Sequence, residues 1–382
     1  MQLTMDKTIL LKNLEQALGV VDRKTAMPIL AHCLLEASEQ GLVISATDLE
    51  TNYRGVSGAE VREPGRCTVL AHSLHSLVKS LPPGEVELAG SDGKLTISTG
   101  ASHYQLLTRN PDEFPPLPPV PEDGWVEIGA GVLVGLLQKV IFSMSTDDLQ
   151  YTYNSIHWAK VERDGTFYLR LVSTDGHRLS LVEHPLPGLA DLDFGEKGLL
   201  VPGRATREIL LLARNQAKDG SIRLCPKTER DQLFIQSGNN TVGMRLLDSK
   251  YPDYEQIIPD KWKLTWAFPR KPLMEAIQRV SSLSSEKFRI TTFRLGRDEV
   301  EITFDNPEVG TGREVVQATL KSGKPDKLPF VIGFNARYLL DPMAVMGGEM
   351  VEMDINAAET PVKLRDPAAT EPSLWLLMPA VL

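Results

Sequence analysis

The sequence repeats one unit three times, and this repetition constrains the fold more than any other feature. The segments LEQALGVV (Leu14–Val21), LQKVIFSM (Leu137–Met144) and IQRVSSLS (Ile277–Ser284) follow one another at offsets of 123 and 140 residues. Each places apolar residues at the spacing of one face of a helix. A self-similar pattern of this length predicts three consecutive structural units of one kind.

A second helix and a strand–turn–strand segment recur in the same order. The second helix starts near Val69, Val201 and Ile332, at offsets of 132 and 131 residues. The strand segments are LTISTGASHYQLLT (Leu95–Thr108) and LFIQSGNNTVGMRLL (Leu233–Leu247). Stretches such as CLLEAS and VEITF alternate apolar and polar residues, which is typical of strands. We therefore expect an α+β fold of three repeated domains, each with two helices packed on antiparallel β-sheets.

Two proline-rich runs separate the units. They span residues Pro115–Pro121 and Tyr251–Pro259, and proline interrupts regular structure. They place the domains at residues 1–122, 123–255 and 256–382. A chain of 382 residues has room for this number of domains.

Positive charge is concentrated in the predicted helices. These cover residues 8–18, 70–81, 130–144, 202–218, 269–282 and 334–347. Together they carry a net charge of +7, whereas the whole chain carries −9, so the remainder carries −16. For one helix, a solvated polar face explains such a bias. For several helices of a repeated unit, a shared basic surface explains it better, and such a surface attracts phosphates without reading bases.

Composition argues against several other classes of protein. Cys33, Cys67 and Cys225 are far apart and odd in number, which argues against a disulfide framework and predicts buried thiols in a reducing compartment. The N-terminal MQLTMDKT lacks the pattern of a signal peptide. No apolar stretch reaches the ~20 residues of a membrane span. These features predict a cytoplasmic protein.

The segment VSTDGHRLSLV (Val172–Val182) raises the possibility of an active site, because Asp175 and His177 lie close together. A catalytic pair of this kind also needs a nucleophile or a metal, and the sequence has no GxSxG, GxxxxGK[ST] or HExxH motif. The Asp-Gly between two apolar runs predicts a hairpin instead, with Gly176 at positive φ. We therefore expect no catalytic residues, no cofactor and no metal.

Several motifs together resemble the bacterial DNA polymerase III beta subunit family, the sliding clamps. They are STDGHRLSLV, DRKTAMPILAHCLL (Asp22–Leu35), SSEKFR (Ser284–Arg289), SKYPDYEQIIP (Ser249–Pro259) and the terminal LLMP. The resemblance covers the whole chain and implies a six-domain ring of two head-to-tail protomers. It implies a processivity factor that encircles duplex DNA and tethers the replicative polymerase. The clamp loader and repair polymerases would be further partners.

The resemblance also implies which residues contact DNA. Lys24 matches a basic residue before the PIL segment and Tyr151 matches an aromatic residue, whereas Asp147 and Thr152 depart from the family pattern. The predicted helices add further basic candidates. These are Lys79, Lys139, Arg204, Arg207, Arg214, Lys218 and Arg279.

A groove that captures apolar peptides is implied between the second and third domains. Its residues here would be Tyr153, Thr174, Gly176, His177, Arg178, Leu179, Pro252, Gln256, Ile257, Leu376, Met378, Pro379 and Leu382. Leu, Ile, Met and Pro side chains form the kind of surface that holds apolar anchors. Tyr153, Gln256, Ala380 and Val381 depart from the family pattern, so partner preference is open.

The implied dimer interface joins the edge of the first domain to the third domain of the other protomer. Its residues would be Tyr104, Leu106, Ser282, Leu283, Glu286 and Lys287. An edge strand needs such a cover. Two alternatives stay open: a duplicated clamp with a role in repair or inhibitor resistance, and a scaffold ring without DNA.

Overall fold

The helices follow the repeated apolar patterns of the sequence. The computed structural model describes residues 1–382 except 23–24, 148, 217–219 and 286–288. In this part of the chain the α-helices are α1 (Lys7–Val20), α2 (Ala71–Ser80), α3 (Ala130–Val140), α4 (Gly203–Arg214), α5 (Arg270–Ser281) and α6 (Ala336–Val345). The six predicted helices are thus confirmed, with different ends.

Helix α1 shows why these segments are helical. The Asp6 carboxylate accepts hydrogen bonds from the backbone N–H groups of Thr8 and Ile9 at 2.7 and 3.2 Å, which caps the first turn. Leu10 and Leu14, one helical turn apart, are fully buried. The cap and the apolar stripe together fix where the helix begins and which face it buries.

Two predicted helix ends are wrong. Helix α3 ends at Val140 rather than at residue 144, because the Ser173 hydroxyl donates to the Val140 carbonyl in place of a helical N–H. Helix α4 ends at Arg214 rather than at residue 218, because Lys12 Nζ donates to the Asn215 carbonyl at 2.8 Å. Side chains from elsewhere in the fold thus satisfy the last carbonyls.

The chain forms two compact units, each made of several segments. Unit 1 contains Met1–Val134, Gly188–Gly195 and Arg204–Asp248, and unit 2 contains Gly135–Pro187, Glu196–Gly203 and Ser249–Leu382. The segment predicted as the central domain contributes to both. The three-domain division at residues 122/123 and 255/256 stays a prediction.

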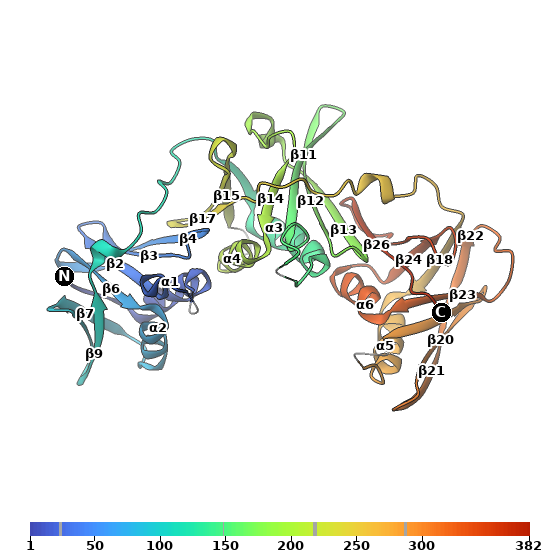
Figure 1. Ribbon diagram of the computed structural model, residues 1–382, viewed down its shortest axis with the longest axis horizontal. Coiled ribbons are helices and arrows are strands. Elements are labelled where there is room, and N and C mark those ends of the chain that lie inside the picture. Colours follow the sequence, from blue (N-terminus) through green and yellow to red (C-terminus); the bar gives the residue numbers. More distant parts are fainter. Residues whose placement is uncertain (23–24, 148, 217–219, 286–288) are drawn as a thin grey trace. The chain divides into compact units, whose positions relative to one another are not determined.

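Unit 1 contains one long sheet. Its strand order is β10 (Val126–Gly129), β15 (Ser221–Lys227), β16 (Gln232–Ser237), β17 (Asn240–Arg245), β4 (Thr51–Ser57), β3 (Gly41–Thr47), β2 (His32–Ser38), β6 (Gly65–Leu70), β9 (Ser102–Arg109), β8 (Lys94–Thr99), β7 (Glu85–Ser91), β1 (Gln2–Asp6) and β5 (Glu60–Glu63). Helices α1 and α2 pack together beside it (Figure 1). Antiparallel pairing of β17 with β4, with Val242 opposite Tyr53, joins strands of the predicted first and second domains.

Unit 2 contains two sheets. The order in the larger is β14 (Leu199–Pro202), β11 (Ser155–Arg163), β12 (Thr166–Thr174), β13 (Arg178–Pro185), β26 (Ser373–Leu377), β25 (Val362–Arg365), β24 (Met350–Ile355), β18 (Leu264–Pro269) and β22 (Thr319–Ser322). The order in the smaller is β21 (Gly310–Gln317), β20 (Glu299–Asn306), β19 (Ile290–Leu295) and β23 (Phe330–Asn335). Strands β13 and β26 pair with Leu179 opposite Leu376, so a strand near the end of the chain lies inside the larger sheet.

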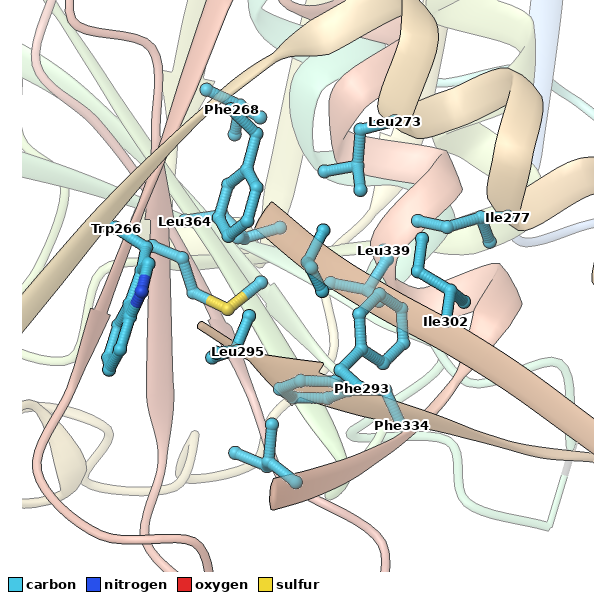
Figure 2. Close-up of a cluster of buried hydrophobic side chains, with 14 of the residues drawn as sticks. Trp266, Phe268, Leu273, Ile277, Phe293, Leu295, Ile302, Phe334, Leu339 and Leu364 are labelled. Carbon is cyan, nitrogen blue, oxygen red and sulfur yellow. The ribbon is translucent and has the colours of Figure 1, made fainter. Parts of the chain in front are cut away.

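A large apolar cluster holds the smaller sheet against α5 and α6 (Figure 2). The rings of Phe293 and Phe334 meet edge to face, with centroids 5.6 Å apart, a favourable arrangement for aromatic pairs. Leu273 and Ile277 of α5 and Leu339 of α6 are almost completely buried against them. The period-two and helical patterns of the sequence therefore meet in one core.

Candidate peptide-binding groove and nucleic-acid interface

A cavity of about 480 Å³ lies in unit 2, between the β12–β13 hairpin, the connector at residues 251–259 and the end of β26. Its lining residues are Thr174, Gly176, His177, Arg178, Leu179, Gln256, Ile257, Pro361, Leu376, Leu377 and Met378. Most of these side chains are apolar. The cavity is therefore suited to apolar anchors presented with a few backbone contacts.

The first wall of this cavity is the β12–β13 hairpin, whose turn is closed by hydrogen bonds between its own residues. The Asp175 carboxylate accepts from the backbone N–H groups of His177 and Arg178, both at 3.0 Å. The Thr174 hydroxyl donates to the Arg178 carbonyl at 2.6 Å. Gly176 has φ of 86°, as the sequence predicted. Asp175 is thus fully engaged in shaping the turn.

Arg178 fixes this hairpin to the rest of unit 2. Its guanidinium donates to Asp341 of α6 at 2.6 Å, to Asp175 at 3.0 Å and to the Phe142 carbonyl. It also lies 4.7 Å from the centroid of the Tyr338 ring. Since its side chain is only 7% exposed, Arg178 is a buried residue that links the hairpin to α6 through charge-assisted hydrogen bonds, and its charge is not free at the surface.

The connector forms a second wall. Gln256 and Ile257 lie in a short 3₁₀ turn, Glu255–Ile257, and Ile257 is 49% exposed. Arg170 holds this turn by donating to Glu255 at 2.6 Å and to the Tyr254 hydroxyl at 3.3 Å.

The His157 side chain packs against the connector. Its ring stacks on that of Tyr251 at 5.2 Å between centroids, and its Nε2 lies 2.9 Å from the Lys197 carbonyl oxygen. Burial lowers the pKa of His157, although this hydrogen bond opposes the shift. A neutral ring is therefore favoured at this position.

The end of the chain forms the third wall. Leu376 and Leu377 are almost completely buried in β26, whereas Met378 is 41% exposed. The Met378 N–H donates to the His177 carbonyl at 2.8 Å, and the Ala380 N–H donates to the Gly333 carbonyl at 2.8 Å. These two hydrogen bonds place residues 378–382, called the tail below, beside both the hairpin and β23.

The predicted DNA-contact residues differ in how free their charges are. Lys79, Arg207 and Arg214 are exposed and make no ion pair with the described residues. Tyr151 is 60% exposed. Lys24 and Lys218 lie outside the described residues.

The remaining basic candidates are paired. Lys139 lies 2.9 Å from Glu371, Arg204 lies 2.8 Å from Asp48, and Arg279 makes two bonds with Glu314, at 2.8 and 2.9 Å. A phosphate would have to compete with these carboxylates, so their charges are less available than those of Arg207 and Arg214.

Two of the strand edges that lack a partner strand in the described chain are those of β9 and β21. Residues 102–107 of β9 pair only with β8, and β21 pairs only with β20. Tyr104 and Leu107 of β9 are 40% and 77% exposed, and Leu106 is partly buried. Leu283 follows α5 and packs on the core cluster, while Ser282 is exposed. Glu286 and Lys287 lie outside the described residues.

Sequence comparison decides the family. Models of the N-terminal, central and C-terminal domains of the DNA polymerase III beta subunit match residues 1–118, 127–253 and 255–379. The chain belongs to the DNA polymerase III beta subunit family. The beta sliding clamps of Caulobacter vibrioides and Pseudomonas putida are each 30% identical to it, over 99% of both chains.

Solved structures of beta subunits agree. The sliding clamp of Bartonella birtlesii bound to griselimycin matches with a TM-score of 0.92 at 28% identity, and both chains are fully covered. That of Pseudomonas aeruginosa bound to griselimycin matches with a TM-score of 0.87 at 29% identity, again over both whole chains. The α+β fold of repeated helix pairs on antiparallel sheets, predicted from the sequence, is confirmed.

The structure brings together most of the groove residues that the beta-subunit resemblance implied. Tyr153 and Pro252 are not among the lining residues, and Pro379 and Leu382 line a neighbouring cavity. Pro361 and Leu377 also line the groove, although they are not among the groove residues predicted from the sequence. Pro361 precedes β25 and reaches the groove only because β25 pairs with β26.

Among the described residues, no three His, Cys, Asp or Glu side chains are placed to hold a metal ion. The three cysteines are buried and unpaired, as predicted. In the same residues, no helix is long and apolar enough to cross a membrane.

Proposed function

We propose that this chain is a DNA sliding clamp: two copies form a ring around duplex DNA and tether the replicative polymerase to it. The observation that carries the proposal is the match of all three beta-subunit domain models, in order, along the chain. The relatives named beta sliding clamp cover 99% of the chain. The exposed basic side chains on α2 and α4 are consistent with it, because phosphate contacts are independent of sequence and permit sliding.

The DNA contacts in this proposal rest on charge and exposure. Arg207 and Arg214 on α4, and Lys79 on α2, offer charges free of carboxylate partners among the described residues. Lys139, Arg204 and Arg279 would contribute less, since each already pairs with a carboxylate. Lys24, Tyr151 and Lys218 complete the proposed set.

The groove in unit 2 would dock the apolar peptides of the polymerase, clamp loader and repair polymerases. Its apolar lining and its preformed hairpin support this role. Griselimycin is bound to two relatives, the sliding clamps of Bartonella birtlesii and Pseudomonas aeruginosa, and we propose that the same ligand binds this groove. Asp175 and His177 then serve as hairpin residues, and the chain acts as an accessory subunit rather than as an enzyme.

The free edges of β9 and β21 would pair with each other between two copies. Backbone groups along residues 102–107 and 310–317 are unpaired by strands on one side in the described chain. Burying such edges against each other satisfies their hydrogen bonds and removes an aggregation hazard. The domain division at residues 1–122, 123–255 and 256–382 belongs to the same proposal.

Retention on circular DNA tests the proposed function. The chain is loaded on nicked circular DNA by the host's clamp loader, and retention is measured by gel filtration before and after the DNA is linearised. A topological clamp stays on the circle and slides off the linear form. Equal retention on both forms would overturn the ring mechanism, and no retention on either would favour a scaffold role without DNA.

A further inference from the structure

A second cavity, of about 590 Å³, lies in unit 2 among the start of β18, residues 324–331 and the turn at residues 356–358. Four of its lining residues are basic: Lys263, Arg294, Lys324 and Lys327. Asp326 is the one carboxylate among the lining residues. This cluster, called the basic pocket below, thus has a formal charge of +3 in a chain of net charge −9.

These charges are weakly compensated. Lys263, Lys324 and Lys327 make no ion pair with the described residues. Arg294 lies 3.6 Å from Glu301, but that carboxylate lies closer to Arg313, at 2.6 Å. Like charges held together without partners favour an anionic ligand.

The Asn356 side chain, a close approach at Gly323 and an aromatic contact hold the walls of the basic pocket. The Lys263 N–H donates to the Asn356 side chain at 2.9 Å, and Asn356 donates to the Lys261 carbonyl at 3.0 Å. A Cβ on Gly323, at φ 88°, would lie 2.1 Å from the Lys263 carbonyl oxygen, so only glycine permits this close return of the chain. Phe330 packs at 5.8 Å on the ring of Trp266.

The basic pocket does not lie on the helix face of the smaller sheet. Phe293 and Leu295 point into the core with α5 and α6. Arg294, which lies between them on β19, therefore points to the opposite face. Duplex DNA at the helices would not reach it.

The basic pocket is instead continuous with the groove. Met378 lines both the groove and the cavity formed by the tail, and Val331 and Ala358 line both that cavity and the basic pocket. The tail pairs with β23 antiparallel through Ala380 and Gly333. Counted along the chain, the four residue steps from Met378, which lines the groove, to Leu382 span about 13 Å when extended.

We propose that the basic pocket binds acidic residues of the same partner peptide whose apolar anchor occupies the groove. This inference rests on the proposed docking function of the groove. It adds a specificity element: peptides with carboxylates about four residues from the anchor bind more tightly than peptides without them. The ligand class is an acidic peptide segment, because the apolar groove that leads to the basic pocket suits a peptide.

Two fluorescent synthetic peptides test the proposal. Both carry a Leu-Leu-Phe anchor and a Gly-Ser spacer of four residues; one ends in three glutamates and the other in three glutamines. Each peptide is made in two versions, with the anchor at its N-terminal or at its C-terminal end. Fluorescence anisotropy gives the Kd of each peptide for the full-length protein. We expect the glutamate peptide to bind about five- to tenfold more tightly, as several exposed ion pairs permit, with the difference lost at high salt.

A charge-matched pair of variants locates the effect. Lys324→Gln/Lys327→Gln should abolish the preference for glutamate, while Lys94→Gln/Lys271→Gln, which removes two exposed lysines elsewhere, should preserve it. Griselimycin should displace both peptides from either variant. Displacement by griselimycin reports on the groove, whereas the preference for glutamate reports on the basic pocket.

Three outcomes would overturn the proposal. Equal affinity of the two peptides, both displaced by griselimycin, would refute the basic pocket and leave the groove intact. Failure of both peptides to bind would argue against the groove as a docking site and would overturn the proposal with it. Displacement of the glutamate peptide by oligothymidylate, dependent on Lys324 and Lys327, would make the basic pocket a nucleic-acid site instead.

Discussion

Leu49 and Gly176 occupy the same position of one repeated turn, with φ of 80° and 86°. Each lies two residues after a threonine whose hydroxyl accepts its N–H, at 2.9 Å for Leu49 and 3.1 Å for Gly176. The aspartates between them, Asp48 and Asp175, each accept two backbone N–H groups in the same manner. The Thr-Asp pair is therefore structural in both turns, and leucine is strained where glycine is not.

Replacing Leu49 by glycine should stabilise the protein. A left-handed conformation costs a residue with a side chain ~1–2 kcal/mol, and part of this gain is offset by the greater freedom of glycine when unfolded. We expect the free energy of unfolding in urea to rise by ~0.5–1 kcal/mol. Gly176→Leu should lower it by ~1–2 kcal/mol, and equal effects of the two substitutions would contradict this view of the turn.

Glu208 should make stability depend on pH. Burial raises the pKa of its carboxyl to about 7, with Arg204 opposing and Asp48 adding to the shift. It is confined there, since a Cβ on Gly19 would lie 1.8 Å from its Oε2. Because the folded pKa exceeds the unfolded value of ~4.3, the stabilisation is present below that value and is lost as the pH rises through about 7.

Glu208→Gln should therefore be more stable than the parent at pH 8, by a difference on the order of 2–3 kcal/mol. The advantage should shrink as the pH falls toward ~4.3. Urea unfolding at several pH values measures it. Glu60→Gln, at an exposed glutamate, serves as the control, and parallel pH profiles for all three proteins would disprove the assignment.

Arg178 should matter far more than its neighbour Arg337. Arg178→Leu strands the Asp341 carboxylate and the Phe142 carbonyl, and should lower the free energy of unfolding by ~2–4 kcal/mol. Arg337 lies 3.5 Å from the same Asp341 but is 77% exposed, so Arg337→Leu should cost less than ~0.5 kcal/mol. Urea unfolding measures the stability of both variants, and griselimycin affinity reports on the groove. Similar losses of stability in the two variants would be inconsistent with a buried Arg178 that links the hairpin to α6.

DNA affinity should separate free from paired arginines. Arg207→Gln or Arg214→Gln should each reduce the slope of log affinity against log salt by about 1. Arg279→Gln should change it less, because Glu314 already binds that guanidinium. Fluorescence anisotropy with a short duplex over a range of salt measures the slopes; a larger effect at Arg279 would argue against the proposed contacts.

An edge substitution should dissociate the dimer. Leu107 is 77% exposed on the unpaired edge of β9, and Leu107→Lys would place a charge in the proposed interface. Light scattering should then report the monomer mass of 42.2 kDa instead of twice that value. Leu149→Lys, at a residue 89% exposed elsewhere, should stay dimeric, and a dimer in both variants would rule out this edge.

Sequence patterns predicted the helices and the groove unequally well. The start of α1 follows from Asp6 and the apolar stripe, which are local signals. The end of α4 depends on Lys12, about 200 residues earlier in the chain, and no local pattern contains that information. Most groove residues came from the family resemblance, whereas Pro361 reaches the groove through strand pairing alone.

By itself, the sequence determined the threefold repetition, the faces that the helices bury and the turn at Gly176, because periodicity and φ preference are local properties. Only the tertiary structure decided that β17 joins β4 and that β13 joins β26, since these pairings use backbone groups that every residue has. The tertiary structure alone also decided which charges are paired: Arg204 and Arg207 look alike in sequence, but among the described residues Arg204 forms an ion pair, with Asp48, and Arg207 forms none. Whether a charge is compensated depends on its distance from the nearest opposite charge, and the tertiary structure sets this distance.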